Sequence, residues 1–284
     1  MSYINNSISL FSAVAGEFQD AIIGWHNLVP EAVLSASSED PDNPVNLLSN
    51  YFTFDSWKAS GPGVQWVEID LPRIQQINYV GIAAHNFFNV SASWQVQYFD
   101  GAIWQPLTPE RLMNDNRPIL STFDDISTRR VRIYIFNSDQ PVYIGVLYVG
   151  RIMRFERGVY VGHSPANYNR VDNIINSVSE GGQFIGRSTV SEGGQTTIDL
   201  DWLSPNYVRN IYVPFQLHAR LKPFFFAWKP STYPTEIIYG WSTSEPVPTV
   251  SGHNYYSATI SMRGDIDGTR RDRQSPGPTP PIVS

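Results

Sequence analysis

Hydrophobic and polar positions alternate most clearly between residues 65 and 99, where three neighbouring segments predict strands. Residues 65–71 alternate, with valine, isoleucine and leucine on one face, which is typical of a half-buried strand. Residues 77–87 are nearly all apolar, as in a strand that is buried on both faces. Residues 93–99 alternate again and lead to Asp100 and Gly101, a strong hairpin signal. Three strands within fewer than forty residues predict an all-β sandwich or barrel.

Weaker patterns on either side add elements to this β-rich region. Further strands are predicted at residues 31–38, 130–135 and 142–150, and the last of these is almost continuously apolar. The Asn-Leu-Leu run at residues 46–48 fits one helical turn. Residues 108–116 fit a short helix that begins at a threonine cap.

The second half of the chain carries a short repeat and a helical pattern. Ser-Glu-Gly-Gly-Gln occurs at residues 179–183 and again at 191–195. Because glycine pairs permit positive φ angles, the repeat predicts two turns around one strand of a β-meander, unless it arose by chance. Apolar spacing over residues 201–221 predicts the one clear helix, with Ser204 as its N-cap. Pro214 lies inside this helix and is expected to kink or split it.

An aromatic segment bounded by prolines follows the predicted helix at residues 223–230. Its rings would face both sides of a strand, so either domain core covers both sides or another subunit covers one of them. We expect an oligomer interface here, together with the N-terminal residues. The interface candidates are Phe224, Phe225, Phe226 and Trp228.

Composition sets the domain organisation and excludes several partners. A length of 284 residues predicts two domains, and we divide the chain into an arm (1–30), a β-sandwich (31–150), a second β-rich domain (151–269) and a disordered tail (270–284). The net charge is −6 without a basic stripe, and cysteine is absent. We therefore expect no nucleic-acid partner and no thiol or disulfide chemistry. No apolar run approaches the ~20 residues of a membrane span, so no membrane insertion is expected.

The sequence offers no catalytic constellation, so we expect no enzyme, no cofactor and no metal. Its five histidines lack metal-ligand spacing. An aromatic loop with polar neighbours suits carbohydrate, because a flat ring stacks on the apolar face of a pyranose while polar groups bond its hydroxyls. A second segment combines an imidazole, an amide and a ring. Core or inter-subunit packing is the strong alternative explanation for both sets. The carbohydrate-binding candidates are Tyr51, Phe54, Asp55, Trp57 and Lys58, then His85, Asn86 and Phe87.

The first half of the chain resembles the discoidin family (F5/8 type C, galactose-binding-like). The resemblance is carried by the Asn-Leu-Leu turn, by Trp57 and Lys58, and by the segments 65–71, 94–97, 130–133 and 144–150. It implies a jelly-roll β-sandwich that binds sugars or lipid head groups through loops at one end. The cysteine pair of many extracellular members is absent, which removes the support for a secreted adhesive role.

The second half looks like tail-tip proteins of long-tailed bacteriophages, either distal tail or minor tail proteins. The segments 162–168, 223–230 and 260–264 carry this resemblance. It implies a β-rich, ring-forming domain with one helix. The fold expected for the whole chain is thus mainly β: a discoidin-like jelly-roll sandwich followed by a second β-rich domain with one α-helix.

Two functions follow from these expectations. The first is a structural component of a phage tail tip or baseplate, located in the virion and assembled in the host cytoplasm. It would form a homo-oligomeric ring, a trimer or a hexamer, contact other tail proteins, and bind a host surface glycan weakly through the discoidin-like module. The alternative is a carbohydrate-binding accessory protein of a glycan-degrading system.

Overall fold

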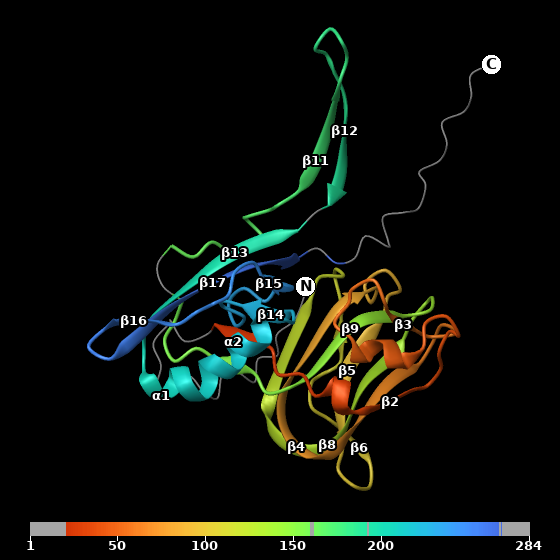
Figure 1. The fold of residues 1–284 in the computed structure, drawn as a ribbon. Helices are drawn as coiled ribbons and strands as arrows, with labels where there is room; N and C mark the ends of the chain where they lie inside the picture. The colour runs from red at the N-terminus through yellow and green to blue at the C-terminus, as the bar shows by residue number, and fades with distance from the viewer. Residues whose placement is uncertain (1–20, 160–161, 192, 267, 269–284) are drawn as a thin grey trace, which may run out of the picture.

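Two β-sheet bodies lie side by side in the computed structural model, which describes residues 21–159, 162–191, 193–266 and 268 (Figure 1). The chain is mainly β with a short helical segment, as expected. The first body is a sandwich. Its strands are β2 (Val33–Ala36), β3 (Trp57–Lys58), β4 (Gln65–His85), β5 (Ser93–Phe99), β6 (Trp104–Pro106), β7 (Arg111–Leu112), β8 (Ile119–Asn137) and β9 (Tyr143–Gly150).

The sandwich arises because β4 and β8 bend and contribute to both layers. The first half of β4 pairs with β2 and with the second half of β8, whereas its second half pairs with β9 and with the first half of β8. The register shifts between Asp70 and Gln75, beside Pro72, which has no N–H to donate to a ladder. The segments 65–71 and 77–87, predicted as separate strands, are therefore one bent strand.

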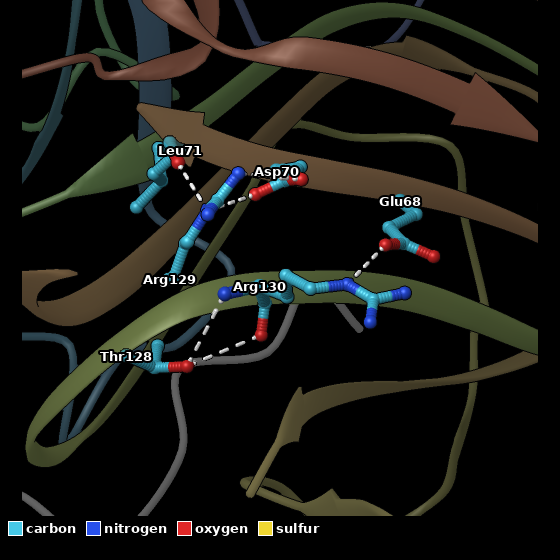
Figure 2. Close-up of polar contacts among 6 residues, drawn as sticks. All are labelled: Glu68, Asp70, Leu71, Thr128, Arg129 and Arg130. Atoms are coloured by element: carbon cyan, nitrogen blue, oxygen red, sulfur yellow. Dashed lines mark hydrogen bonds and ion pairs between the residues drawn. The ribbon is translucent and has the colours of Figure 1, made fainter. Parts of the chain in front are cut away.

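Ion pairs across β4 and β8 lie next to this bend (Figure 2). Arg129 Nε donates to Asp70 Oδ1 at 2.7 Å and to the Leu71 carbonyl at 3.0 Å, and Arg130 Nε donates to Glu68 Oε1 at 2.6 Å. Because exposed pairs contribute only about 0–1 kcal/mol each, they orient the strands more than they stabilise the fold. The sandwich is held by its apolar core, which contains the inward-facing residues of β4 and also Trp57 and Trp94.

The second body is a sheet covered by the helical segment. Its strand order is β10-β1-β14-β15-β17-β13, with β16 paired to β17. These strands are β1 (Ile22–Gly24), β10 (Met153–Arg154), β13 (Gly194–Leu203), β14 (Phe224–Ala227), β15 (Ile237–Ser242), β16 (Thr249–Gly252) and β17 (Tyr255–Asp265). The described end of the predicted arm thus supplies β1, while residues 1–20 and the whole predicted tail lie outside the described residues.

The predicted helix is interrupted just before Pro214. It consists of α1 (Pro205–Tyr207), a π-helical turn (Val208–Tyr212) and α2 (Val213–Ala219). Ser204 Oγ accepts from the Tyr207 N–H at 3.2 Å, so the predicted N-cap is confirmed. Since Pro214 cannot donate a backbone hydrogen bond, the wider π turn that precedes it accommodates the missing bond. Two short 3-10 helices, η2 (Val29–Glu31) and η3 (Val45–Ser49), precede the sandwich strands, and η3 contains the predicted turn at 46–48.

A further core joins the two bodies. Tyr79 of β4 and Tyr148 of β9 pack against Phe225 of β14 and Tyr239 of β15. This contact explains why residues 77–87 are apolar on both faces. It also settles which surface covers the aromatic segment: Phe225 faces the sandwich, while Phe224 and Phe226 face the core under the helix.

Two local predictions are wrong. Residues 108–116 form no helix, because Arg111 and Leu112 pair with β5 and Thr108 Oγ1 accepts from the Val96 N–H at 3.0 Å. The meander is also incorrect, although the first repeat forms a turn in which the Gly182 N–H donates to the Ser179 carbonyl at 2.9 Å. The strands β11 (Asn173–Val178) and β12 (Phe184–Ser191) form a hairpin, and β13 joins the large sheet instead of pairing with β12.

Candidate binding groove

A groove of about 500 Å³ lies where the loop after η3 meets the second sheet. The loop contributes residues 51–54, the turn after α2 contributes 221–223, and β15 contributes 239–241. Asp265 at the end of β17 completes the lining. The groove is therefore built from both bodies, and the core between the sheets fixes its two walls relative to each other.

Exposed aromatic rings form the walls of this groove. Phe52 and Phe54 stack with their ring centroids 5.2 Å apart and their planes 20° apart, and both remain more than half exposed. Trp241 contributes a third exposed ring from β15. Asn50 holds the loop in shape, because its Oδ1 accepts from the Phe52 N–H at 2.7 Å and its Nδ2 donates to Asp55 Oδ2 at 3.0 Å.

Polar groups also line the groove. Tyr239 donates its hydroxyl to the Tyr51 carbonyl at 2.9 Å, and burial raises the pKa of Tyr239, so this phenol stays protonated. The Lys222 ammonium lies 5.0 Å from the centre of the Tyr51 ring, a cation–π distance. Lys222 and Asp265 thus place opposite charges in a mainly apolar groove.

The structure divides the predicted carbohydrate-binding set. Tyr51 and Phe54 line the groove, whereas Asp55 bonds Asn50 and Lys58 lies 3.7 Å from Asp40. Trp57 is a core residue: its side chain is fully buried and its Nε1 donates to the Ser38 carbonyl at 3.0 Å. It is therefore no platform for a ligand.

The second predicted set is also structural. His85 and Phe87 are fully buried, and His85 Nε2 lies 2.9 Å from the Arg117 carbonyl. Burial lowers the pKa of His85 to about 4, so its imidazole is neutral at pH 7. Asn86 Oδ1 accepts from the Tyr143 N–H at 2.8 Å and its Nδ2 donates to the Pro141 carbonyl at 3.1 Å. These three residues connect the strand ends and do not face solvent.

Sequence reasoning missed Trp241 and Lys222, which lie far from the loop along the chain. A signal for Trp241 was present, since residues 237, 239 and 241 alternate on one face of β15. Ile237 and Tyr239 are buried against the sandwich, whereas Trp241 lies outside the area that the sandwich covers and is exposed. The aromatic interface candidates are not free surface either: Phe224, Phe225 and Phe226 are buried, and Trp228 is half-buried against Tyr233.

Within the described residues, no group of three histidines or carboxylates is placed to hold a metal ion. None of the described helices has the length and apolar character that a membrane crossing requires.

The protein consists of a β-sandwich joined to a second β-sheet body. Several solved structures are similar to part of this chain. The family 32 carbohydrate-binding module of Clostridium perfringens NanJ, in complex with galactose, shares 16% identity over 47% of this chain and 99% of the module, with a TM-score of 0.39. Chitosan-binding module 1 of a Paenibacillus chitosanase/glucanase shares 19% identity over 44% of this chain and 98% of the module, with a TM-score of 0.39.

Larger enzymes also contain a similar region. A Ruminococcus gnavus GH29 fucosidase in complex with fucose shares 16% identity over 45% of this chain, with a TM-score of 0.40, and the match covers 27% of the fucosidase. The match to another GH29 protein, SpGH29, covers 28% of that chain. No protein-family model matches the chain, and no curated protein matches it.

Proposed function

We propose that this protein is a non-catalytic glycan-binding protein whose site is the groove lined by Phe52, Phe54 and Trp241. The observation that carries the proposal is that three exposed rings line one groove together with Lys222 and Asp265. Aromatic rings stack on the apolar faces of pyranose sugars. Charged groups of both signs bond the hydroxyls, which act as donors and as acceptors.

The dimensions of the groove support a small ligand. A volume of about 500 Å³ falls within the roughly 300–1,000 Å³ typical of ligand sites, which are mostly apolar with a few polar groups. The walls come from two bodies that share a core, so little ordering is needed on binding. A neutral oligosaccharide of a few units is therefore the ligand class that we propose.

The test is binding to a glycan array, followed by calorimetry on the best ligand. Phe54→Ala and Trp241→Ala should each weaken binding by about tenfold, which corresponds to about 1.4 kcal/mol, with an unchanged thermal midpoint. Phe88→Ala is the matched control, because Phe88 is also about half exposed but does not line the groove. Equal affinity of all three variants, or no retained glycan, would reject the proposal.

A second candidate is a structural subunit of a larger assembly such as a phage tail tip in a virion. The observation that favours it is the β11–β12 hairpin, which pairs with no other described strand. Light scattering and imaging of the purified protein separate the candidates. Rings would support a tail component that carries a glycan-binding groove, whereas a glycan-binding monomer at every concentration would support an accessory protein of a glycan-degrading system.

A further inference from the structure

A second cavity, which we call the junction cavity, lies where the two bodies meet and shares no lining residue with the groove. Its volume of about 530 Å³ is within the range of small-molecule sites. The lining consists of Asn78 of β4, Asp125 of β8, residues 25–26 after β1, residues 151–154 up to the end of β10, and residues 210–211 of the π-helical turn. Both bodies therefore contribute to this cavity, as they do to the groove.

Hydrogen bonds across the junction hold these walls together and occupy their acceptors. Asn78 Oδ1 accepts from the Ile152 N–H at 2.7 Å, and its Nδ2 donates to Asp125 Oδ1 at 2.7 Å. Gln76 Nε2 donates to the other carboxylate oxygen of Asp125 at 3.2 Å. The protein itself thus supplies a donor to each oxygen of this carboxylate, so Asp125 does not depend on a cationic ligand for a partner.

The donors of the junction cavity, by contrast, are left for a ligand. The Arg151 guanidinium and the Trp25 indole N–H bond no residue that the structure describes. His26 Nδ1 accepts from the Arg151 backbone N–H at 3.4 Å, which places the proton of the neutral imidazole on Nε2. Three unused donors in one cavity favour a ligand that accepts hydrogen bonds.

The charge of the lining is also positive. Arg151 and Arg154 outnumber Asp125, the one carboxylate of the lining. Burial and then Arg151 lower the pKa of His26, against the opposing effect of Glu31. His26 is therefore neutral at pH 7, and the lining carries one net positive charge.

Apolar side chains supply the rest of the cavity. Trp25, Ile152 and Ile211 line it, and Ile211 is 43% exposed. Ile211 belongs to the π-helical turn, and such turns are frequent at functional sites. The cavity thus combines an unpaired guanidinium with surfaces that suit a ring or a chain.

We propose that the junction cavity binds a small monoanion, a carboxylate attached to an apolar ring or chain. The carboxylate accepts two parallel hydrogen bonds from the Arg151 guanidinium, and the apolar part packs on Trp25 and Ile211. A single carboxylate balances the charge of the lining, whereas a phosphate dianion leaves an excess of negative charge beside Asp125. The protein then has two ligand sites, one for a neutral glycan and one for an organic acid.

The experiment is an NMR titration of the full chain with phenylacetate, followed at the indole N–H signal of Trp25. The variant Trp25→Phe identifies this signal by its loss. Phenylacetate should shift the signal saturably with a dissociation constant in the millimolar range, as expected for so small a ligand. Phenylacetamide has nearly the same shape without the charge and should bind about tenfold more weakly, and phenyl phosphate should also bind more weakly than phenylacetate.

Two arginine variants test the proposed contact. Arg151→Gln should weaken phenylacetate binding by about tenfold, because the charge and the paired donors are lost. Arg73→Gln is the matched control, since Arg73 is exposed on β4 and does not line the junction cavity, and it should bind phenylacetate like the wild type.

Three outcomes would overturn the proposal: no saturable shift at Trp25, equal affinity for phenylacetamide or a higher one for phenyl phosphate, and unchanged affinity in Arg151→Gln. Arg151→Gln should bind glycan like the wild type, and Phe54→Ala should bind phenylacetate like the wild type. Failure of the junction cavity as a ligand site is therefore distinguishable from failure of the glycan site.

Discussion

Among single residues, His85 shows how the sandwich uses a polar side chain inside its core. It is fully buried next to Phe87, at a ring distance of 4.6 Å, and its Nε2 bonds the Arg117 carbonyl. Burial disfavours the charged imidazole. The effect of burial outweighs the opposing effects of the Arg117 carbonyl and of Asp115, and it lowers the pKa of His85 to about 4.

This pKa predicts a pH dependence of stability. Between the unfolded pKa near 6.5 and the folded value of about 4, the unfolded state binds more protons, so the free energy of unfolding falls as the pH drops through this window. His85 alone accounts for up to about 3 kcal/mol. Burial also lowers the pKa of His26, His163 and His218, which adds to the same slope.

Urea unfolding between pH 7.5 and 4.5 measures the effect of His85. His85→Gln should reduce the slope of stability against pH by about one proton within the window. His253→Gln, at an exposed histidine, is the matched control for replacing an imidazole by an amide, and its slope is compared with that of His85→Gln. Equal slopes for His85→Gln and the wild type would contradict the burial argument.

Among the elements, the contact between β4 and β14 depends on a glycine. A Cβ atom on Gly81 would lie 2.6–3.0 Å from three ring atoms of Phe225, which is closer than carbon atoms pack. Phe225 is itself fully buried between the sheets. The two bodies can approach this closely because position 81 has no side chain.

We therefore expect Gly81→Ala to lower the free energy of unfolding by about 1–3 kcal/mol, the usual cost of overpacking. Gly61→Ala is the control, since no atom lies within 4 Å of a Cβ there, and it should change stability by less than about 0.5 kcal/mol. Adding Phe225→Leu to Gly81→Ala should recover part of the loss, because the two positions are in contact. Additive losses in the double variant would show that the clash is not the cause.

Elements whose residues specify them locally could be predicted from the sequence. Asp100 accepts from the N–H groups of residues 102 and 103, and Ser204 caps its helix, because both bonds join near neighbours. The bend of β4 depends on its two different partners, and residues 108–116 became extended because they pair with β5. Such long-range pairings leave little signal in one sequence.

The residues of the groove could likewise be predicted only in part. Tyr51 and Phe54 were predicted because one loop combines rings with polar groups. Trp57 belongs to the same run of residues, but its alternation with Lys58 on β3 directs it into the core. Trp241 joins the groove only because the second sheet packs against the sandwich.

Considering the whole molecule, the sandwich is inserted into the second body. Strand β1 precedes the sandwich in the chain, and β10 and β13–β17 follow it, yet all of them belong to one sheet. Hydrogen bonds cross the shared core as well. Tyr79 donates to the His26 carbonyl and Tyr148 donates to the Pro223 carbonyl, each at 2.7 Å. Separating the bodies would break these bonds and expose the apolar faces of β4 and β9.

We therefore expect the two bodies to unfold together. Calorimetry should give one transition with equal calorimetric and van't Hoff enthalpies. An intermediate with only one body folded would expose the core between the sheets, whose fully buried residues include Tyr79, Tyr148, Phe225 and Ile22. The double variant Tyr79→Phe/Tyr148→Phe tests the coupling. It removes both hydroxyls while keeping the rings, and should lower the midpoint of the single transition without splitting it, since each lost bond contributes about 0.5–1.5 kcal/mol. Two transitions in the wild-type protein, or an isolated fragment 31–150 that melts as the full chain does, would show that the shared core does not couple the bodies.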